Sequence, residues 1–339
     1  MKQLIYIFSI LLFFISCDDY KLEDGQMPLG YNPPEFGEPV YDYGENVLTN
    51  EGFELGRALF YDPILSVDQS ISCADCHQQF AAFAHVGHDL SHGFDGRFGM
   101  RNSTPIFNNR WYPAFFWDGG ANHIEIVPSN AITNPVEMNH DLAACVERLN
   151  QDEEYAKLFK KVFDIEEVNS KYLFYALAQF TGSIVSENSK YDQVKRNETT
   201  FSESEERGYS LFLTHCEDCH TEPLLTNNDY INNGLTINES QDEGRKTITT
   251  DENDLGKFRV PSLRNIMLTS PYMHDGRFRT IDAVLDHYEN GIEQSPTLSP
   301  KLQNGISLTE EERTDLTNFL HTLTDETLIN DDRFSNPFF

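Results

Sequence analysis

The chain has 339 residues, of which 39% are hydrophobic and 24% are charged, with 55 acidic residues against 25 basic ones and a formal net charge of −30. This composition can bury a sizeable core, so it excludes an intrinsically disordered chain, a collagen and a protein with many membrane spans. Because phosphate groups would be repelled, the acid excess argues against nucleic-acid binding and favours a basic protein partner.

The first sixteen residues are predicted to be an export signal. Lys2 precedes an apolar run over 4–15 that is too short to span a bilayer comfortably. The run ends in a small residue and Cys17, a pattern that resembles a bacterial lipobox, so we expect residues 1–16 to be removed and Cys17 to carry a lipid. An ordinary secretory signal is the alternative, and both place the protein in the periplasm or at the cell surface. Residues 17–48 are predicted to form a tether, and the lipid would be the only attachment to a membrane.

Helical periodicity dominates the rest of the chain. Residues 56–60 (Gly-Arg-Ala-Leu-Phe) recur as residues 208–212 (Gly-Tyr-Ser-Leu-Phe), and Ser202 with Glu205 forms a capping box ahead of the second copy. Alternating strand patterns are scarce. The sequence therefore predicts a mainly α fold built as an approximate duplication with long loops. Further helices are predicted over 142–149, 153–163, 172–185, 281–288 and 310–323.

Two pentapeptides carry the strongest chemical signal. Residues 73–77 read Cys-Ala-Asp-Cys-His, and residues 216–220 read Cys-Glu-Asp-Cys-His. In a C-x-x-C-H motif the two thiols form thioethers with the haem vinyl groups, and the adjacent imidazole binds the iron. A zinc site or a thioredoxin-like pair would leave the histidine after each pair unexplained. We therefore predict two covalently bound c-type haems, held by Cys73, Cys76, His77, Cys216, Cys219 and His220.

The two motifs predict two cytochrome c-like haem domains, over 49–190 and 191–339, with the boundary in the polar segment 186–202. Cys145 is the remaining cysteine of this part of the chain. It lies on a predicted helix and is expected to be a core thiol.

The second iron ligand decides whether a haem transfers electrons or binds a substrate. The residue pattern leaves this choice open at both motifs. Near the first motif the candidates are His85, His88 and His92. For the second haem they are Met267, Met273, His274, His287 and Tyr288.

Seven sequence blocks follow one another between residues 50 and 325. They are the two C-x-x-C-H motifs and the blocks at 101–105, 116–119, 134–138, 260–265 and 271–276. Together they resemble the bacterial dihaem cytochrome c peroxidase family, including its MauG-type branch. The resemblance implies a first haem that reduces hydrogen peroxide and a second haem that passes electrons to it.

The resemblance also implies roles for individual residues. Trp117 matches a tryptophan that lies between the two haems and helps electrons to cross. Glu137 matches an acid above the first haem, where a carboxylate can move a proton between the peroxide oxygens. An interdomain calcium ion would be held by Asn102 and by the backbone carbonyls of Thr269 and Pro271.

The resemblance further implies two distal ligands. His92 resembles a displaceable histidine at the first haem, although the length of its loop differs from the family pattern. At the position of Tyr288, peroxidases of the family carry a methionine. A tyrosine there is similar to the pattern of the MauG-type branch. A phenolate there favours higher oxidation states of the iron. Family members often place a glutamine and a proline in the distal pocket, and the corresponding residues 125–133 read Glu-Ile-Val-Pro-Ser-Asn-Ala-Ile-Thr, which departs from that pattern.

Three functions are consistent with these observations. The first is an exported peroxidase that reduces hydrogen peroxide to water with electrons from a small c-type cytochrome or cupredoxin. The second is a MauG-type oxidase that modifies a partner protein through high-valent haem. The third is a non-enzymatic electron carrier, which would need a permanent strong ligand at the first haem.

Overall fold

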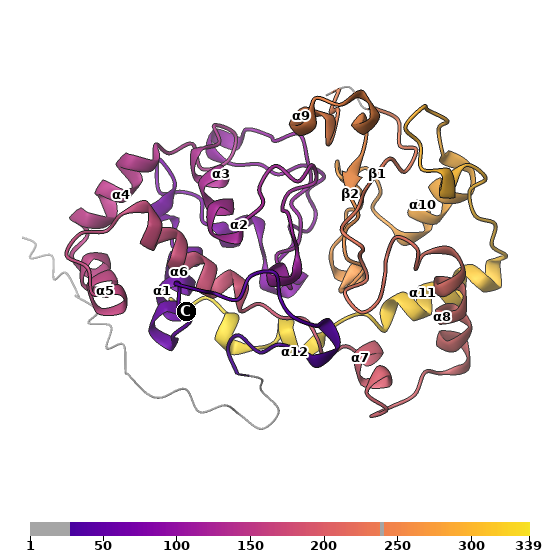
Figure 1. Cartoon of the computed structure of the whole chain (residues 1–339), viewed down its shortest axis with the longest axis horizontal. Coiled ribbons are helices and arrows are strands. Elements are labelled where there is room, and N and C mark those ends of the chain that lie inside the picture. Colours follow the sequence, from indigo (N-terminus) through magenta and orange to yellow (C-terminus); the bar gives the residue numbers. More distant parts are fainter. Residues whose placement is uncertain (1–27, 238–240) are drawn as a thin grey trace, which may run out of the picture.

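The computed structural model describes residues 28–237 and 241–339 and shows two helical lobes that lie side by side (Figure 1). The predicted export signal and Cys17 lie outside the described residues. Within these ranges the chain is mainly helical and its strands are short, which confirms the predicted fold class. Every helix in the described part is too short or too polar to cross a bilayer.

The first lobe is built on a helix pair, α1 (Asn50–Tyr61) against α6 (Ser170–Gly182). Gly56 lies where these helices touch, and a Cβ added to it would be 2.0 Å from the backbone oxygen of Ala176. Only glycine allows this close approach of the two backbones. Cys145 is fully buried in the same core, as predicted.

The second lobe repeats this arrangement with α8 (Glu203–His215) against α11 (Glu310–His321). A Cβ added to Gly208 would lie 2.0 Å from the backbone oxygen of Asp315. The two glycines that recur in the sequence therefore have the same packing role in the two lobes. This equivalence confirms the approximate duplication.

The other predicted helices are present, with ends that differ from the prediction by a few residues. They are α4 (Leu142–Gln151), α5 (Glu153–Phe163) and α10 (Ile281–Asp286). Several short elements were not predicted, because so few residues give no periodic signal. These are α2 (Cys73–Cys76), α3 (Val127–Thr133), α7 (Lys190–Lys195), α9 (Lys246–Thr249), α12 (Glu326–Ile329) and the antiparallel strands β1 (Tyr230–Ile231) and β2 (Phe258–Arg259).

Much of the predicted tether packs on the folded chain. Phe36 and Tyr43 are buried, and the ring of Phe36 meets Trp111 edge-on with 5.3 Å between ring centroids. The hydroxyl of Tyr43 lies 3.2 Å from that of Ser183. The prediction of a free tether is therefore wrong for residues 28–48, because their apolar side chains are removed from water against the first lobe.

The C-terminal segment returns to the first lobe. Leu328 and Phe334 are buried in the core of that lobe, and the hydroxyl of Tyr61 donates to the carbonyl of Phe334 at 2.6 Å. Figure 1 shows α12 and the C-terminus beside α1 and α6. The division predicted near residue 190 assigns this segment to the second domain, whereas its packing belongs to the first lobe.

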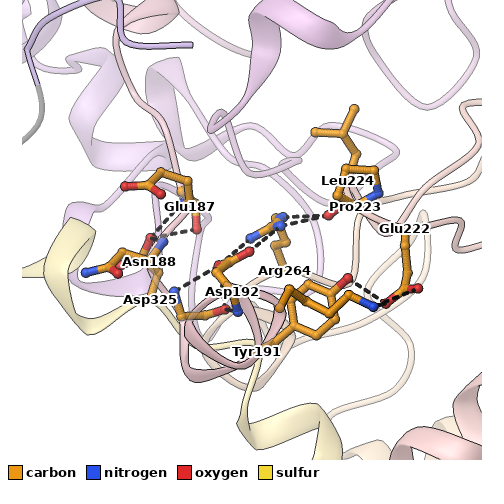
Figure 2. Close-up of polar contacts among 12 residues, drawn as sticks. Glu187, Asn188, Tyr191, Asp192, Glu222, Pro223, Leu224, Arg264 and Asp325 are labelled. Carbon is orange, nitrogen blue, oxygen red and sulfur yellow. Dashed lines mark hydrogen bonds and ion pairs between the residues drawn. The ribbon is translucent and has the colours of Figure 1, made fainter. Parts of the chain in front are cut away.

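A buried polar junction lies where the chain crosses between the lobes (Figure 2). Arg264 donates two hydrogen bonds to Asp192, at 2.8 and 2.7 Å, and a third to the carbonyl of Pro223 at 2.7 Å. Asp325 accepts the backbone N–H of Glu187 at 2.9 Å. These partners are distant in sequence, so the junction fixes how the two lobes meet.

Candidate active site

The first C-x-x-C-H motif forms one short helical turn, α2. Ser72 caps the turn, and the carboxylate of Asp75 accepts the backbone N–H of Ser72 at 2.7 Å. The two thiols of the motif are free, and Nδ1 of His77 lies 3.1 Å from the carbonyl of Phe83. A hydrogen bond donated from Nδ1 leaves Nε2 of His77 for the haem iron. The geometry of this motif therefore fits a c-type haem.

Glu137 lies beside this motif. Its side chain accepts a hydrogen bond from the amide of Asn134 at 2.8 Å, and burial raises its pKa. Burial and then the charge of Glu137 raise the pKa of the Cys76 thiol to about 12. Gly93 packs directly on Glu137, since an added Cβ would lie 2.4 Å from the Cα of Glu137. The acid is thus held firmly next to the first motif.

The three histidines that follow the first motif form one cluster. The ring centroids of His85 and His88 are 4.5 Å apart, those of His88 and His92 are 4.4 Å apart, and those of His85 and His92 are 5.2 Å apart. The sequence presents these residues as competing ligands for one iron. The structure instead brings all three together.

The second C-x-x-C-H motif follows α8 directly. Nδ1 of His220 lies 3.1 Å from the carbonyl of Pro261, and burial lowers the pKa of this imidazole to about 4. Cys216, Cys219 and His220 line a cavity of about 220 Å³. A neutral imidazole held at Nδ1 and two free thiols at a cavity wall again fit a covalent haem.

The position of each residue relative to this cavity distinguishes the candidates for the distal ligand of the second haem. Met273, His274 and Tyr288 line it, whereas Met267 and His287 are not among its lining residues. Nε2 of His287 lies 3.0 Å from a backbone carbonyl, so this nitrogen is already engaged. The predicted ligand Tyr288 is therefore on the cavity wall, and its neighbour His287 is not.

Tyr288 reaches the cavity from a π-helical turn over His287–Gly291, which continues α10. Such turns occur often at functional sites. The side-chain amide of Asn233 lies 3.5 Å from the hydroxyl of Tyr288 and 3.5 Å from the sulfur of Met273. Burial raises the pKa of Tyr288, and the Asn233 hydrogen bond opposes this shift. Sequence reasoning missed Asn233, because a lone asparagine in a loop gives no signal.

Trp117 and the predicted calcium ligands share the same cavity. The indole N–H of Trp117 donates to the carbonyl of Asn102 at 2.9 Å, and both residues line the cavity with Thr269 and Pro271. Among the described residues, none donates a hydrogen bond to the carbonyls of Thr269 and Pro271 or to the amide oxygen of Asn102. Unused oxygen acceptors of this kind fit a calcium ion.

Arg101 holds the Trp117 loop against the second lobe. It donates to Asp118 at 2.5 Å and to Asp242 at 2.6 and 2.8 Å. Although burial raises the pKa of Asp242, the hydrogen bonds from Arg101 outweigh this and lower it. Arg101 lies in a recognised sequence block, but its role depends on Asp242, which is far along the chain and could not be inferred.

Comparisons with known proteins agree with this geometry. Residues 50–200 match the family model for di-haem cytochrome c peroxidase, and residues 205–324 match the model for cytochrome c. The chain is 35% identical to the methylamine utilization protein MauG of Methylorubrum extorquens, over 83% of this chain and 80% of the relative. It is 32% identical to cytochrome c551 peroxidase of Nitrosomonas europaea, over 80% of this chain and 79% of the relative.

A solved structure of a MauG-like protein associated with microbial copper homeostasis has a TM-score of 0.84 and 32% identity, covering 94% of this chain and 100% of that chain. The two family models imply two haem c domains, in agreement with the two motifs. The chain belongs to the family of dihaem cytochrome c peroxidases and MauG proteins.

Proposed function

We propose that the protein is an exported dihaem peroxidase that reduces hydrogen peroxide to water with electrons from a small redox protein. The observation that carries this proposal is Glu137, a carboxylate held by Asn134 and packed on Gly93 beside the first motif. A purely electron-transferring haem needs no such acid. Family membership, shared with a named cytochrome c peroxidase, supports the same function.

Haem, when bound, supplies the iron that binds peroxide and relays the electrons for its reduction. The protein supplies the proton transfer. Asn134 occupies Oε1 of Glu137, so Oε2 is available to take the proton of one peroxide oxygen and deliver it to the other. The raised pKa of Glu137 helps the group to hold that proton while water leaves.

Electrons are proposed to reach the first haem from the second along Trp117. Its indole is fixed by Asn102, and its backbone carbonyl accepts the N–H of Arg259 at 2.7 Å. The formal charge of −30 would steer a basic cytochrome or cupredoxin to the surface. The calcium ion, held by Asn102, Thr269 and Pro271, would then brace the wall between the haems.

We place the protein in the periplasm or at the cell surface, attached to a membrane through a lipid on Cys17. The support is the sequence pattern of residues 1–17 and the covalent haems, which are attached after export. Labelling with a radioactive fatty acid tests this placement, because the wild type should be labelled and a Cys17→Ser variant should not.

Steady-state peroxide consumption by the haem-loaded protein tests the function. With a reduced small c-type cytochrome present, two donor molecules should be oxidised for each peroxide over many turnovers. A haem spectrum that ignores both peroxide and cyanide in every redox state would contradict the proposal and indicate an electron carrier.

A MauG-type oxidase that modifies a partner protein is the second candidate, and Tyr288 favours it. This tyrosine lies on the cavity wall where a phenolate ligand would stabilise higher oxidation states. Two relatives named MauG or MauG-like, at 35% and 32% identity, also support this second candidate function. Slow donor turnover with a long-lived oxidised state after peroxide addition would select this function over the peroxidase.

A further inference from the structure

The loop after the first motif places three imidazoles around a common point. One ring nitrogen from each of His85, His88 and His92 can be chosen so that all three lie within 4.8 Å of one another. Three nitrogens that bind one tetrahedral ion at ~2.1 Å lie about 3.4 Å apart, so small rotations of the side chains close the site. Stacking of three imidazole rings alone does not require their nitrogen atoms to point to a common position.

One histidine of the cluster has a buried ring nitrogen without a hydrogen-bond partner among the described residues. His85 is 4% exposed, and its Nδ1 is buried without a hydrogen-bond partner among the described residues. A buried polar atom of this kind costs free energy unless a partner is supplied. His88 is exposed, so the cluster is open to solvent at one of its members.

We propose that His85, His88 and His92 form a metal site, additional to the two haem irons, that binds one divalent first-row transition-metal ion such as Cu²⁺ or Zn²⁺. Imidazole suits these ions, whereas calcium and magnesium require oxygen ligands. The nearby carboxylate of Asp89 is occupied by Arg279 at 2.8 Å. Because His88 is exposed, a water molecule can complete the coordination of the ion.

The backbone of the loop is held in place before any ion binds. The amide of Asn102 donates to the carbonyls of His88 and Asp89 at 3.2 and 3.1 Å. The N–H of Ser91 donates to the carbonyl of Arg101 at 2.9 Å, and its carbonyl accepts the N–H of Gly99 at 2.7 Å. A loop fixed on both sides loses little further freedom when a metal binds, which favours affinity.

The site also bears on the first haem. His92 can bind either the haem iron or the proposed ion, because one cluster nitrogen cannot serve both. An occupied site would therefore keep His92 away from the iron and leave the distal face to Glu137. This consequence rests on the proposed peroxidase function, whereas the metal site does not.

The test is metal binding by the full-length, haem-loaded protein. Zn²⁺ and Cu²⁺ are titrated by calorimetry in excess Mg²⁺ and Ca²⁺, which occupy carboxylate sites on this acidic chain but do not compete for imidazole. We expect one ion per chain in addition to two iron atoms by elemental analysis. The Cu²⁺ form should show nitrogen hyperfine structure in its electron paramagnetic resonance spectrum.

A His88→Gln variant should bind at least ~10-fold more weakly, because loss of even an outer partner of a metal site costs that much. His88 is exposed, so this change does not threaten the fold, and His85→Gln provides a second test from the buried side. The control is His321→Gln at the exposed end of α11, which should bind like the wild type. Equal affinity in His88→Gln and His321→Gln, or no stoichiometric binding, would overturn the proposal, whatever the peroxidase assay shows.

Discussion

The indole N–H of Trp117 and the carbonyl of Asn102 are joined by a hydrogen bond of 2.9 Å, and the amide of the same asparagine reaches the loop that follows the first haem motif. One residue therefore links the wall of the cavity at the second motif to the surroundings of the first motif. Covalent and hydrogen-bonded paths of this kind carry electrons better than gaps do, which gives Trp117 a specific role to test.

Replacing Trp117 with phenylalanine should slow electron transfer between the haems by at least several-fold, because the indole surface and its hydrogen bond to Asn102 are lost. Stopped-flow spectroscopy would follow oxidation of the second haem after peroxide is mixed with the half-reduced protein. Trp111→Phe is the matched control, since Trp111 donates to the carbonyl of Gly37 within the first lobe. Equal rates in the two variants would remove Trp117 from the path.

Replacing Glu137 with glutamine should slow peroxide cleavage by ~10²-fold or more while both haems stay attached, since the variant cannot accept a proton. The measurement is the rate of the haem absorbance change on mixing with peroxide. Glu147→Gln on α4 alters an exposed glutamate whose side chain accepts a hydrogen bond from Gln151, so its rate should match the wild type. Unchanged cleavage in Glu137→Gln would refute its role as the proton carrier.

Replacing Tyr288 with methionine should raise the reduction potential of the second haem, because a thioether ligand favours the reduced iron more than a phenolate does. A spectroelectrochemical titration gives this potential directly. Tyr272 lines the same cavity but donates its hydroxyl to the carbonyl of Ile266, so Tyr272→Phe serves as the control. If Tyr288→Met leaves the potential at the wild-type value, Tyr288 is not a ligand.

Glu187 should make the protein less stable as the pH rises. Burial raises its pKa to about 7, in spite of the ion pair with Arg196. Between pH 4.5 and about 7 the unfolded chain has released this proton and the folded chain still holds it, so the free energy of unfolding falls through this window. Because the ion pair with Arg196 offsets part of the cost of burying Glu187, we expect a loss on the order of 1–2 kcal/mol.

Urea unfolding at pH 5 and pH 8 measures this effect. A Glu187→Gln variant should gain stability relative to the wild type as the pH rises, because glutamine does not titrate. Glu198→Gln removes the exposed partner of the same Arg196 and should follow the wild type at both pH values. Identical pH dependence in wild type and Glu187→Gln would contradict the assignment.

Replacing Arg264 with methionine should reduce the free energy of unfolding by about 3–5 kcal/mol, because Asp192 would be left buried without its cation. Changing Asp192 to asparagine in the same chain should restore part of the loss. Arg279, which pairs with Asp89 at the surface, is the control, and Arg279→Met should cost less than ~1 kcal/mol. Equal effects of the two arginine changes would show that the junction in Figure 2 is not a stabilising element.

The helices and the haem motifs could be predicted because their signals are local. Ser202 and Thr309 both cap helices through side chains that accept backbone N–H groups, as their sequences suggest. The recurring glycines at 56 and 208 indicate the duplication from the sequence alone. Each of these features is decided within a dozen residues.

The rest depends on partners that are far apart in sequence. Phe36 gives no local sign that it will pack on Trp111, so the segment around it resembled a tether. From the sequence, the histidines after the first motif are alternative ligands for one iron. Only the folded backbone shows that they form one cluster. Asn233 has no pattern at all, and only the cavity shows that it meets Tyr288.

The return of the last residues to the first lobe has a consequence for how the protein is made. Phe334 fills a place in a core whose other members, such as Phe53 and Phe180, leave the ribosome far earlier. Until synthesis is complete, that face of the lobe has no cover and exposes apolar surface. The lobe that holds the first motif therefore completes its core only when a segment from the far end of the chain has joined it.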